Sequence, residues 1–309
     1  MPEQERIAKY KEARRHGTAA FPCAFYQTRS DLMKGRPFEA KHHWQEELEI
    51  IHIEKGHFRV EINMKRYDVS RECLCFVNSG ELHYLYSQDH YLEQACVFSP
   101  SVISFRSPDA SEEQLIEPFL RHKLAMPVML TDESPAFSVI LKEFKNIGEI
   151  FEKESGRDLF DYTTGDAVSE LKIKASLLQM IAALKQYELL TPLRSESNVK
   201  IDALKKTLTY IQEHYREKIY ISRLAELMSF NEQYFCRFFK KAIGKSPVAY
   251  INEYRIRQAI RLLRETSLPI TDIAYECGFT NLGHFINEFK KETGETPLKL
   301  RKKYLYESI

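Results

Sequence analysis

The stretch that decides the fold is residues 270–297, which read ITDIAYECGFTNLGHFINEFKKETGETP, because the chain contains a second copy of its pattern. The other copy, residues 221–247, reads ISRLAELMSFNEQYFCRFFKKAIGKSP. The copies are offset by 49 residues at first, and by 50 after one additional residue in the later copy. Each has a short apolar-periodic run, a turn and a longer run with basic residues. The repeat therefore predicts two helix–turn–helix units, at about 221–243 and 270–293.

Each unit has the residue types that a helix–turn–helix needs at its helix ends and turn. Ser222 is predicted to cap the first short helix. Asn231 and Asn281 are predicted to cap the two longer helices, because their side chains accept a backbone N–H. Gly278 suits a turn with positive φ, and Ser229 stands at the same place in the first copy, where it is a slightly strained choice.

The longer helix of each unit is predicted to bury one face and to offer the other to a DNA groove. The predicted buried stripe is Phe235, Phe238, Phe239, Phe285 and Phe289. The predicted DNA-contacting residues are Gln233, Cys236, Arg237, Lys240, Leu282, Gly283, Ile286, Asn287 and Lys290. Arginine pairs with guanine, glutamine or asparagine with adenine, aliphatic groups with thymine methyls, and lysine with phosphates. A merely solvated face is the alternative, and exposed aliphatic side chains at 282 and 286 argue against it.

Between the copies, Pro247 is predicted to open a helix that runs to about Arg264. At about 1.5 Å per residue this helix is roughly 25 Å long. A rigid connection of that size can hold two recognition helices near the separation of adjacent major grooves, about 34 Å. The chain is therefore expected to read a site without internal symmetry, whose two half-sites differ.

The segment from Ile219 to Lys303 resembles the DNA-binding domain of the AraC/XylS family of bacterial transcriptional regulators. The resemblance rests on residues 273–279 (IAYECGF), on His284-Phe285, on 289–291 (FKK) and on Gly294 with Thr296-Pro297. It implies sequence-specific binding to double-stranded promoter DNA. Asn287 stands where family members often carry arginine, and Gly283 where a small hydroxyl residue is common, so the operator sequence does not follow from the resemblance.

The N-terminal part of the chain predicts a different architecture. From Phe21 to about Phe105 it reads as short strands separated by turn signals, among them 48–53, 58–63, 73–77 and 83–86, which favours an antiparallel barrel or sandwich. The fold class is accordingly α+β, with an N-terminal antiparallel β-barrel and a C-terminal all-α domain. The expected domains are a barrel at 1–130, a helical segment at 131–190, a linker at 191–200 and a DNA-binding domain at 201–305.

The helical segment is a candidate for dimerisation. One helix is predicted at roughly 132–154, and a longer one at 166–190 carries an apolar seam at intervals of three and four: Val168, Leu171, Ala175, Leu178 and Ala182. Such a seam packs either on the barrel or on a second subunit. A homodimer is therefore an expected partner state.

Two stretches of the barrel resemble the cupin motifs, 42–49 (HHWQEELE) before Gly56 and 78–83 (NSGELH). In AraC-type regulators this resemblance implies a small barrel that binds an effector. The candidate effector-binding residues are His43, Trp44, Gln45, Glu49, His83 and Tyr84, with Tyr86 as a further aromatic wall. Metal-binding cupins use two histidines, a glutamate and a third histidine. Gln45 replaces one histidine here, and an amide is a poorer transition-metal ligand, so neither metal nor cofactor is expected.

Composition agrees with a cytoplasmic globular protein. No apolar run reaches the roughly 18 residues of a membrane span, and the N-terminus lacks a signal-peptide core. The six cysteines form no CxxC pair and read as small buried residues, with Cys73-Leu74-Cys75 as a weak redox or metal candidate. Residues 201–309 carry 19 Lys and Arg against 13 Asp and Glu, whereas the remainder carries 26 against 31. This asymmetry suits a polyanion partner for the C-terminal part only.

The favoured function is a transcriptional regulator controlled by a small-molecule effector, with a carbohydrate as the candidate ligand and no enzymatic activity. RNA polymerase is a further expected partner if the protein is an activator, and the nucleoid is its expected place in the cell. The alternatives are a ligand-independent regulator whose barrel only dimerises, and a metal-dependent cupin enzyme with a DNA-binding tail.

Overall fold

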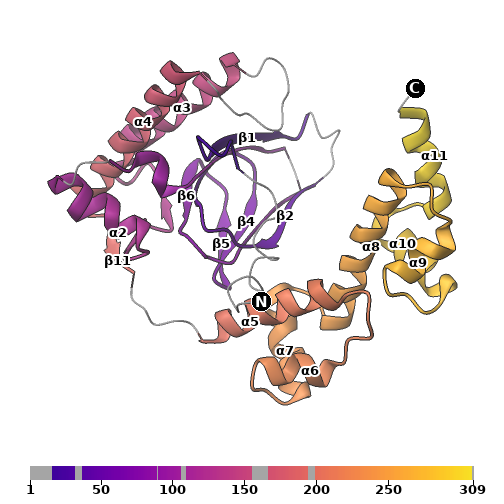
Figure 1. Cartoon of the computed structure of the whole chain (residues 1–309). Helices are drawn as coiled ribbons and strands as arrows, with labels where there is room; N and C mark the ends of the chain where they lie inside the picture. Colours follow the sequence, from indigo (N-terminus) through magenta and orange to yellow (C-terminus); the bar gives the residue numbers. More distant parts are fainter. Residues whose placement is uncertain are drawn as a thin grey trace. The chain divides into compact units, whose positions relative to one another are not determined.

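The computed structural model describes residues 16–31, 37–88, 90–105, 109–154, 166–193 and 199–307. The chain divides into two compact units, one built of residues 11–197 and one containing residues 198–309 (Figure 1). The α+β class is confirmed: the first unit combines strands with a few helices, and the described residues of the second unit are helical. The predicted linker falls largely on residues 194–198, which lie outside the described residues, as do the N-terminal residues 1–15.

The strands of the N-terminal unit form two main antiparallel sheets. A five-stranded sheet has the order β1-β8-β3-β6-β10 and a four-stranded sheet the order β2-β7-β4-β5. The first contains β1 (Cys23–Arg29), β8 (Leu92–Phe98), β3 (Leu48–Lys55), β6 (Cys73–Val77) and β10 (Met129–Leu130). The second contains β2 (Phe38–His43), β7 (His83–Ser87), β4 (Phe58–Ile62) and β5 (Lys65–Val69). A short third pairing joins β9 (Leu124–Ala125) to β11 (Thr191–Pro192).

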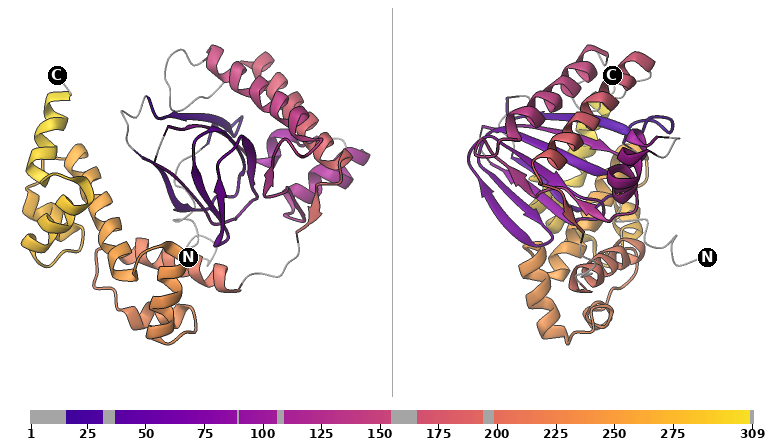
Figure 2. Two further views of the ribbon diagram at one scale, coloured as in Figure 1. Left: turned by 180° about the vertical axis from the view of Figure 1, so that it is seen from behind. Right: turned by 90° about the vertical axis from the view of Figure 1, so that its left-hand side faces the viewer.

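The five-stranded sheet is buried on both faces. One face packs on the four-stranded sheet through a core that includes Ile51, Val60 and Leu85. The other face is covered by α3 (Phe137–Glu154) and α4 (Ala167–Gln186), as Figure 2 shows. Shorter turns, η2 (Pro100–Ile103), η3 (Glu112–Ile116) and α2 (Glu117–Leu120), close the same core. Successive residues of β3 therefore face the four-stranded sheet and the helices in turn, because successive side chains of a strand point to opposite faces.

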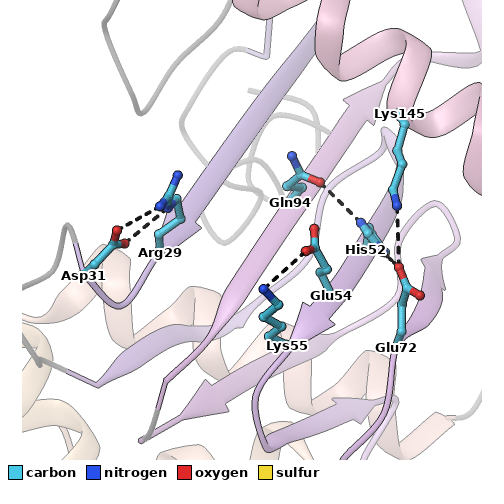
Figure 3. A network of polar contacts seen from close by, with 8 residues as sticks. All are labelled: Arg29, Asp31, His52, Glu54, Lys55, Glu72, Gln94 and Lys145. Carbon is cyan, nitrogen blue, oxygen red and sulfur yellow. Dashed lines mark hydrogen bonds and ion pairs between the residues drawn. The ribbon is translucent and has the colours of Figure 1, made fainter.

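A polar network lies on the helix-facing side of this sheet. The His52 ring is fully buried, and its Nδ1 lies 3.2 Å from the Gln94 side-chain oxygen, while its Nε2 lies 2.9 Å from Glu72 (Figure 3). Lys145 of α3 reaches the same Glu72 carboxylate at 3.7 Å. The network ties β3 to α3 and satisfies a polar ring that would otherwise be costly to bury.

The apolar seam predicted on the long helix lies on the exposed side of α4. Val168 is 58% exposed and Leu171 is 68% exposed, Ala175 and Ala182 are also exposed, and Leu178 is half-buried. The residues of α4 that meet the sheet and α3 are Ile173, Ser176, Leu177, Met180, Ile181, Ala183 and Leu184. The interpretation of the seam as core packing is wrong, because the helix has two apolar stripes and the sheet covers the other one.

The six cysteines are free thiols, and five of them are buried as predicted. Cys73 and Cys75 lie on the same face of β6 with their sulfur atoms 3.7 Å apart. The hydrogen bond with the Cys73 thiol, together with burial, raises the pKa of Cys75 well above its ordinary value, which keeps it an unreactive thiol. Among the described residues, no helix has the length and apolarity that crossing a lipid bilayer requires.

The second unit consists of helices. After α5 (Val199–His214), α6 (Ile221–Leu227) and α7 (Glu232–Ile243) form the first helix–turn–helix. The linker helix α8 (Pro247–Glu265) leads to α9 (Ile270–Glu276) and α10 (Leu282–Thr293), the second helix–turn–helix, and α11 (Pro297–Glu307) follows. The linker helix begins at Pro247 as predicted, with the Ser246 hydroxyl accepting from the Ala249 N–H.

Candidate DNA interface and effector site

The two recognition helices begin with the same structure. The Asn231 side chain accepts the Tyr234 N–H at 2.9 Å, and the Asn281 side chain accepts the His284 N–H at 2.9 Å. Both predicted asparagine caps are confirmed, and α7 and α10 end at Gly244 and Gly294 in the left-handed conformation. The predicted Ser222 cap is wrong: α6 starts two residues earlier, with Tyr220 at the N-cap position and Ser222 in the first turn.

The turns of the two units also differ as the residue types predict. Gly278 has φ +80°, and Ser229 adopts φ +54° at the equivalent place. A non-glycine residue in this region carries a modest strain, so the first turn is the less relaxed of the two.

The predicted groove face is for the most part accessible. Exposed side chains on it are Gln233, Arg237 and Lys240 on α7, and Asn287 and Lys290 on α10, with Gly283 also exposed. On the opposite face Phe235, Phe239, Phe285 and Phe289 are fully buried. Phe238 is half-buried rather than part of the core, and packs against Phe230 and Tyr234 at the edge of the first helix–turn–helix.

Three of the predicted DNA-contacting residues are only half-accessible: Cys236, Leu282 and Ile286. Leu282 and Ile286 pack against the core formed by α8, α9 and α10. The premise that these aliphatic side chains are exposed is therefore wrong, because the core of the second helix–turn–helix extends to the edge of its recognition helix. Any groove contact they make uses only their outer edge.

Two exposed residues of the recognition helices were not predicted to contact DNA. Tyr234 and His284 occupy equivalent positions in the repeat. Each is the third residue of its recognition helix, and both are exposed. Tyr234 is 39% exposed, although it also packs edge-on against Phe230. The 50-residue offset between the copies is the signal that would have paired them.

Four of the six candidate effector residues come together at one end of the space between the two main sheets. The Gln45 amide nitrogen donates to Glu49 Oε2 at 3.0 Å, and His83 Nε2 lies 3.1 Å from the same oxygen. The rings of His43 and His83 are 4.0 Å apart between centroids. Gln45, Glu49 and His83 are all buried, so this is a polar cluster inside an apolar core.

The cluster is electrostatically coupled. Burial alone would raise the pKa of Glu49, but the hydrogen bond with His83 and the nearby His43 and His16 rings outweigh it and lower the pKa. His43 Nδ1 lies 2.7 Å from the Lys41 carbonyl oxygen, and His83 Nδ1 lies 2.9 Å from that of Glu81. With Nδ1–H donating to a carbonyl, each ring leaves Nε2 for a second partner, which for His83 is the Glu49 carboxylate.

This donor set fits a divalent cation. Ligand atoms of His43, Glu49 and His83 lie within 4.8 Å of one another, and backbone carbonyls fix both rings through Nδ1, as in many metal sites. Two imidazoles and a carboxylate suffice for such an ion without a ligand from Gln45. The expectation that no metal binds stays a prediction.

The two aromatic candidates lie elsewhere. Tyr84 points away from the space between the sheets: its ring stacks on His42 at 4.6 Å, and its hydroxyl donates to Glu39 at 3.3 Å. Its assignment to the effector site is wrong, because His83 takes the inward position and strand alternation turns Tyr84 outward. Tyr86 has the same outward parity. Trp44 is 5% exposed and lies between β2 and β3.

A further buried carboxyl group was not predicted. Glu93 of β8 shares strand parity with the core residue Ala95 and is 4% exposed. Burial and the charge of Glu49 raise its pKa to about 8, although a hydrogen bond with Thr28 opposes the shift. The apolar–polar alternation of β8 contained the signal, because an acidic residue stands at an inward position.

Taken together, these features define a class of protein. Two helix–turn–helix units stand in tandem in one chain, each with an exposed basic recognition helix, after a two-sheet domain that buries a convergent polar cluster. This is the construction of a DNA-binding regulator with a ligand-binding domain.

Comparison with known proteins agrees. Residues 36–103 match the AraC-like ligand binding domain, and residues 224–303 match a helix-turn-helix domain. The HTH-type transcriptional regulator YdeC of Bacillus subtilis (strain 168) is 25% identical over 296 residues, 94% of this chain and 96% of that protein. The HTH-type transcriptional activator RhaS of Escherichia coli (strain K12 / DH10B) is 24% identical over 258 residues, 82% of this chain and 84% of that protein. The DNA-binding domain of AdpA, solved in complex with a target DNA, is 25% identical and covers 34% of this chain and 95% of that chain, with a TM-score of 0.33.

The two matched segments are of the kinds found in AraC-type helix-turn-helix transcriptional regulators. The chain is a DNA-binding regulator with an N-terminal domain of the AraC-like ligand-binding type. The resemblance drawn from the repeat is confirmed. The relatives named above are transcriptional regulators rather than enzymes.

Proposed function

We propose that the cluster of His43, Gln45, Glu49 and His83 binds the small-molecule effector that controls DNA binding. One observation carries the proposal: among the described residues, the buried Gln45 Oε1 atom has no hydrogen-bond partner. A buried acceptor without a donor is costly, and a ligand that donates a hydrogen bond removes the cost. Convergent polar groups within an apolar site are also what ligand specificity requires.

The chemistry of the cluster favours a ligand rich in donors. The Glu49 carboxylate and the Gln45 amide oxygen accept hydrogen bonds, and an ionised Glu49 repels an anionic ligand. A neutral polyhydroxyl compound such as a carbohydrate meets both conditions.

Trp44 provides the assay, because it is the one tryptophan of the chain and is adjacent to His43 and Gln45. Neutral sugars and their acid derivatives are titrated while Trp44 fluorescence and thermal stability are recorded. We expect a neutral sugar to raise the stability of the native state. Glu49→Gln should weaken that response, and Tyr84→Phe, which alters an outward-facing residue, should not. A response that is identical in Glu49→Gln and wild type would rule out the cluster as the site.

For DNA, we propose that Gln233, Arg237 and Lys240 of α7 and Asn287 and Lys290 of α10 face the major groove. Cys236, Gly283, Leu282 and Ile286 then line its wall. The α7 face is polar and basic, whereas the α10 face combines one asparagine and one lysine with aliphatic edges, so the two half-sites should differ in sequence. Selection of random-sequence duplexes with the full chain tests this, because identical half-sites would contradict it.

We further propose a homodimer joined by the exposed stripe of α4. Val168, Leu171, Ala175, Leu178 and Ala182 repeat at intervals of three and four, the spacing that packs one helix on another. Isolated apolar residues on a surface need no partner, but a continuous helical stripe of this kind favours a second copy of the same helix. If the protein is an activator, RNA polymerase is a further partner, and binding to promoter DNA would place the protein at the bacterial nucleoid.

A divalent cation is the alternative occupant of the cluster, favoured by the convergence of His43, Glu49 and His83. Metal analysis of purified protein distinguishes a bound cation from a small-molecule effector. Stoichiometric iron or manganese would support the alternative of a metal-dependent cupin enzyme. DNA binding that no ligand alters would instead support a regulator whose N-terminal domain only dimerises.

A further inference from the structure

A three-way junction lies at the centre of the DNA-binding unit, formed around Arg255 of the linker helix α8. Its guanidinium donates to the carbonyl oxygen of Tyr215 at 2.8 Å through Nε, and to that of Glu217 at 2.7 Å through Nη2. The same guanidinium lies 5.7 Å from the centre of the Phe279 ring. Arg255 thus contacts a segment before the first helix–turn–helix and the turn of the second.

The two carbonyl groups belong to the connection between α5, which ends at His214, and α6, which begins at Ile221. Carbonyls that follow a helix end have no partner within the helix and require one from outside. The planar fork of arginine can satisfy two such oxygens at once, whereas the single ammonium of lysine cannot hold the same geometry. Arg255 therefore fastens the entrance of the first unit to the linker helix.

The turn of the second helix–turn–helix packs against the same connection between α5 and α6. Gly278 lies so near this connection that a Cβ atom there would be 2.4 Å from the Tyr215 carbonyl oxygen and 2.9 Å from that of Arg216. Tyr215 is 9% exposed and packs edge-on against Tyr254 of α8 at 5.3 Å, and Phe279 is 2% exposed. The backbone of the first unit's entrance is therefore in direct contact with the second unit's turn.

Elsewhere, each half of α8 packs on one unit. Near its start, Tyr250 contacts Phe239 of α7 at 5.7 Å between ring centroids. Its later residues Ile256, Ala259 and Leu263 form a core with α9 and α10. At the Arg255 junction, three segments meet: the connection between α5 and α6, the helix α8, and the turn of the second helix–turn–helix.

We propose that Arg255 is a positioning residue for bipartite DNA recognition, which sets the offset between the two recognition helices. The proposal rests on the proposed function to the extent that both units must bind DNA. Two linked sites gain affinity only when their geometry lets both engage together. Loosening the junction should therefore leave each helix–turn–helix able to read its own bases while the distance between half-sites becomes less strictly defined.

The test uses the full chain and random-sequence DNA. Duplexes are selected with wild type, Arg255→Ala, Arg255→Lys and Arg264→Ala, and the half-site sequences and their separations are determined. Arg264 is a matched control on the same helix, with an exposed side chain whose contact is Glu265 at 3.9 Å. Affinities for the selected wild-type site and for each half-site alone are then measured.

We expect Arg255→Ala to select the same two half-site sequences as wild type but over a broader range of separations. Its affinity for the wild-type site should fall about 10- to 100-fold, as the linked-site advantage is lost, while isolated half-sites bind within about twofold of wild type. Arg255→Lys should be intermediate, and Arg264→Ala should match wild type.

Each other outcome overturns a specific part. If wild type selects no bipartite site, the proposed mode of DNA binding fails. If Arg255→Ala keeps the narrow separation of wild type, Arg255 does not set the offset. If Arg255→Ala loses one half-site sequence altogether, its role is to maintain the fold of that unit and the positioning role is refuted.

Discussion

Replacing Glu93 by glutamine should change how the stability of the N-terminal unit depends on pH. Glu93 is 4% exposed, and burial together with the charge of Glu49 raises its pKa from 4.5 to about 8. The folded unit therefore holds a neutral carboxylic acid at neutral pH. Glutamine keeps nearly the same shape and can still exchange a hydrogen bond with Thr28, but it cannot ionise.

The sign follows from proton binding. Between about pH 4.5 and pH 8 the unfolded chain releases the Glu93 proton, whereas the folded unit retains it, so the free energy of unfolding falls as pH rises. A folded-state pKa of about 8 corresponds to a total loss of about 5 kcal/mol across this window, taken as an upper bound. This loss is absent below the window and complete above it. Glu93→Gln removes it, so the variant should gain stability over wild type progressively from about pH 5 to pH 8.

Urea unfolding followed by Trp44 fluorescence measures this, because the chain's one tryptophan lies in the N-terminal unit and is 5% exposed. Wild type, Glu93→Gln and the control Glu152→Gln, an exposed residue of α3, are compared from about pH 5 to pH 9. The control should follow wild type at every pH. A Glu93→Gln difference that is constant over the whole range would refute the assignment of a raised pKa to Glu93.

Four further outcomes are expected. Arg237→Ala should weaken specific DNA binding by about 1–3 kcal/mol and relax one base position in selected sites; an unchanged binding profile would remove Arg237 from the groove face. The logarithm of the DNA-binding constant should fall steeply and linearly with the logarithm of salt concentration, because lysines and arginines displace counterions, and a flat response would contradict phosphate contacts. If the cluster takes a divalent cation, Mn²⁺ or Zn²⁺ should raise the unfolding temperature of wild type and of Tyr84→Phe but not of His83→Ala, and an equal shift in all three would locate the ion elsewhere. Leu171→Lys should dissociate the dimer in sedimentation experiments, whereas Lys172→Ala should not, and a dimer that survives Leu171→Lys would exclude the α4 stripe as its interface.

The features that could be predicted are those that depend on neighbours close in sequence. Asn231 and Asn281 cap their helices through N–H groups three residues later, and the positive φ at Ser229 and Gly278 belongs to a single turn. The duplication strengthens such local signals, because each copy tests the interpretation of the other. The same holds for Glu49 on β3 and His83 on β7, whose inward directions follow from strand alternation, whereas Gln45 lies between β2 and β3.

The errors concern features that depend on distant partners. Which stripe of α4 is buried depends on the five-stranded sheet and α3, so the periodicity of Val168 and Leu171 could not decide between packing on the barrel and packing on a second subunit. Leu282 and Ile286 were expected to be exposed because the edge of the α8–α9–α10 core is not visible in the helical period. Tyr84 was expected to supply an aromatic wall of the effector site, but it follows the inward-facing His83 on β7, and neighbouring strand residues face opposite ways.

By itself, the sequence determined that this chain carries two helix–turn–helix units, where their recognition helices begin, and that a polar cluster accompanies an antiparallel β domain. Periodicity, capping residues and turn residues act over a few positions, so a single sequence contains them. Only the tertiary structure decided that Glu93 is buried within the influence of the Glu49 charge, that one face of α4 stays uncovered, and that Arg255 joins the entrance of the first helix–turn–helix to the turn of the second. Those features arise where segments far apart in the chain meet, and burial, desolvation and long-range hydrogen bonds exist only once they have met.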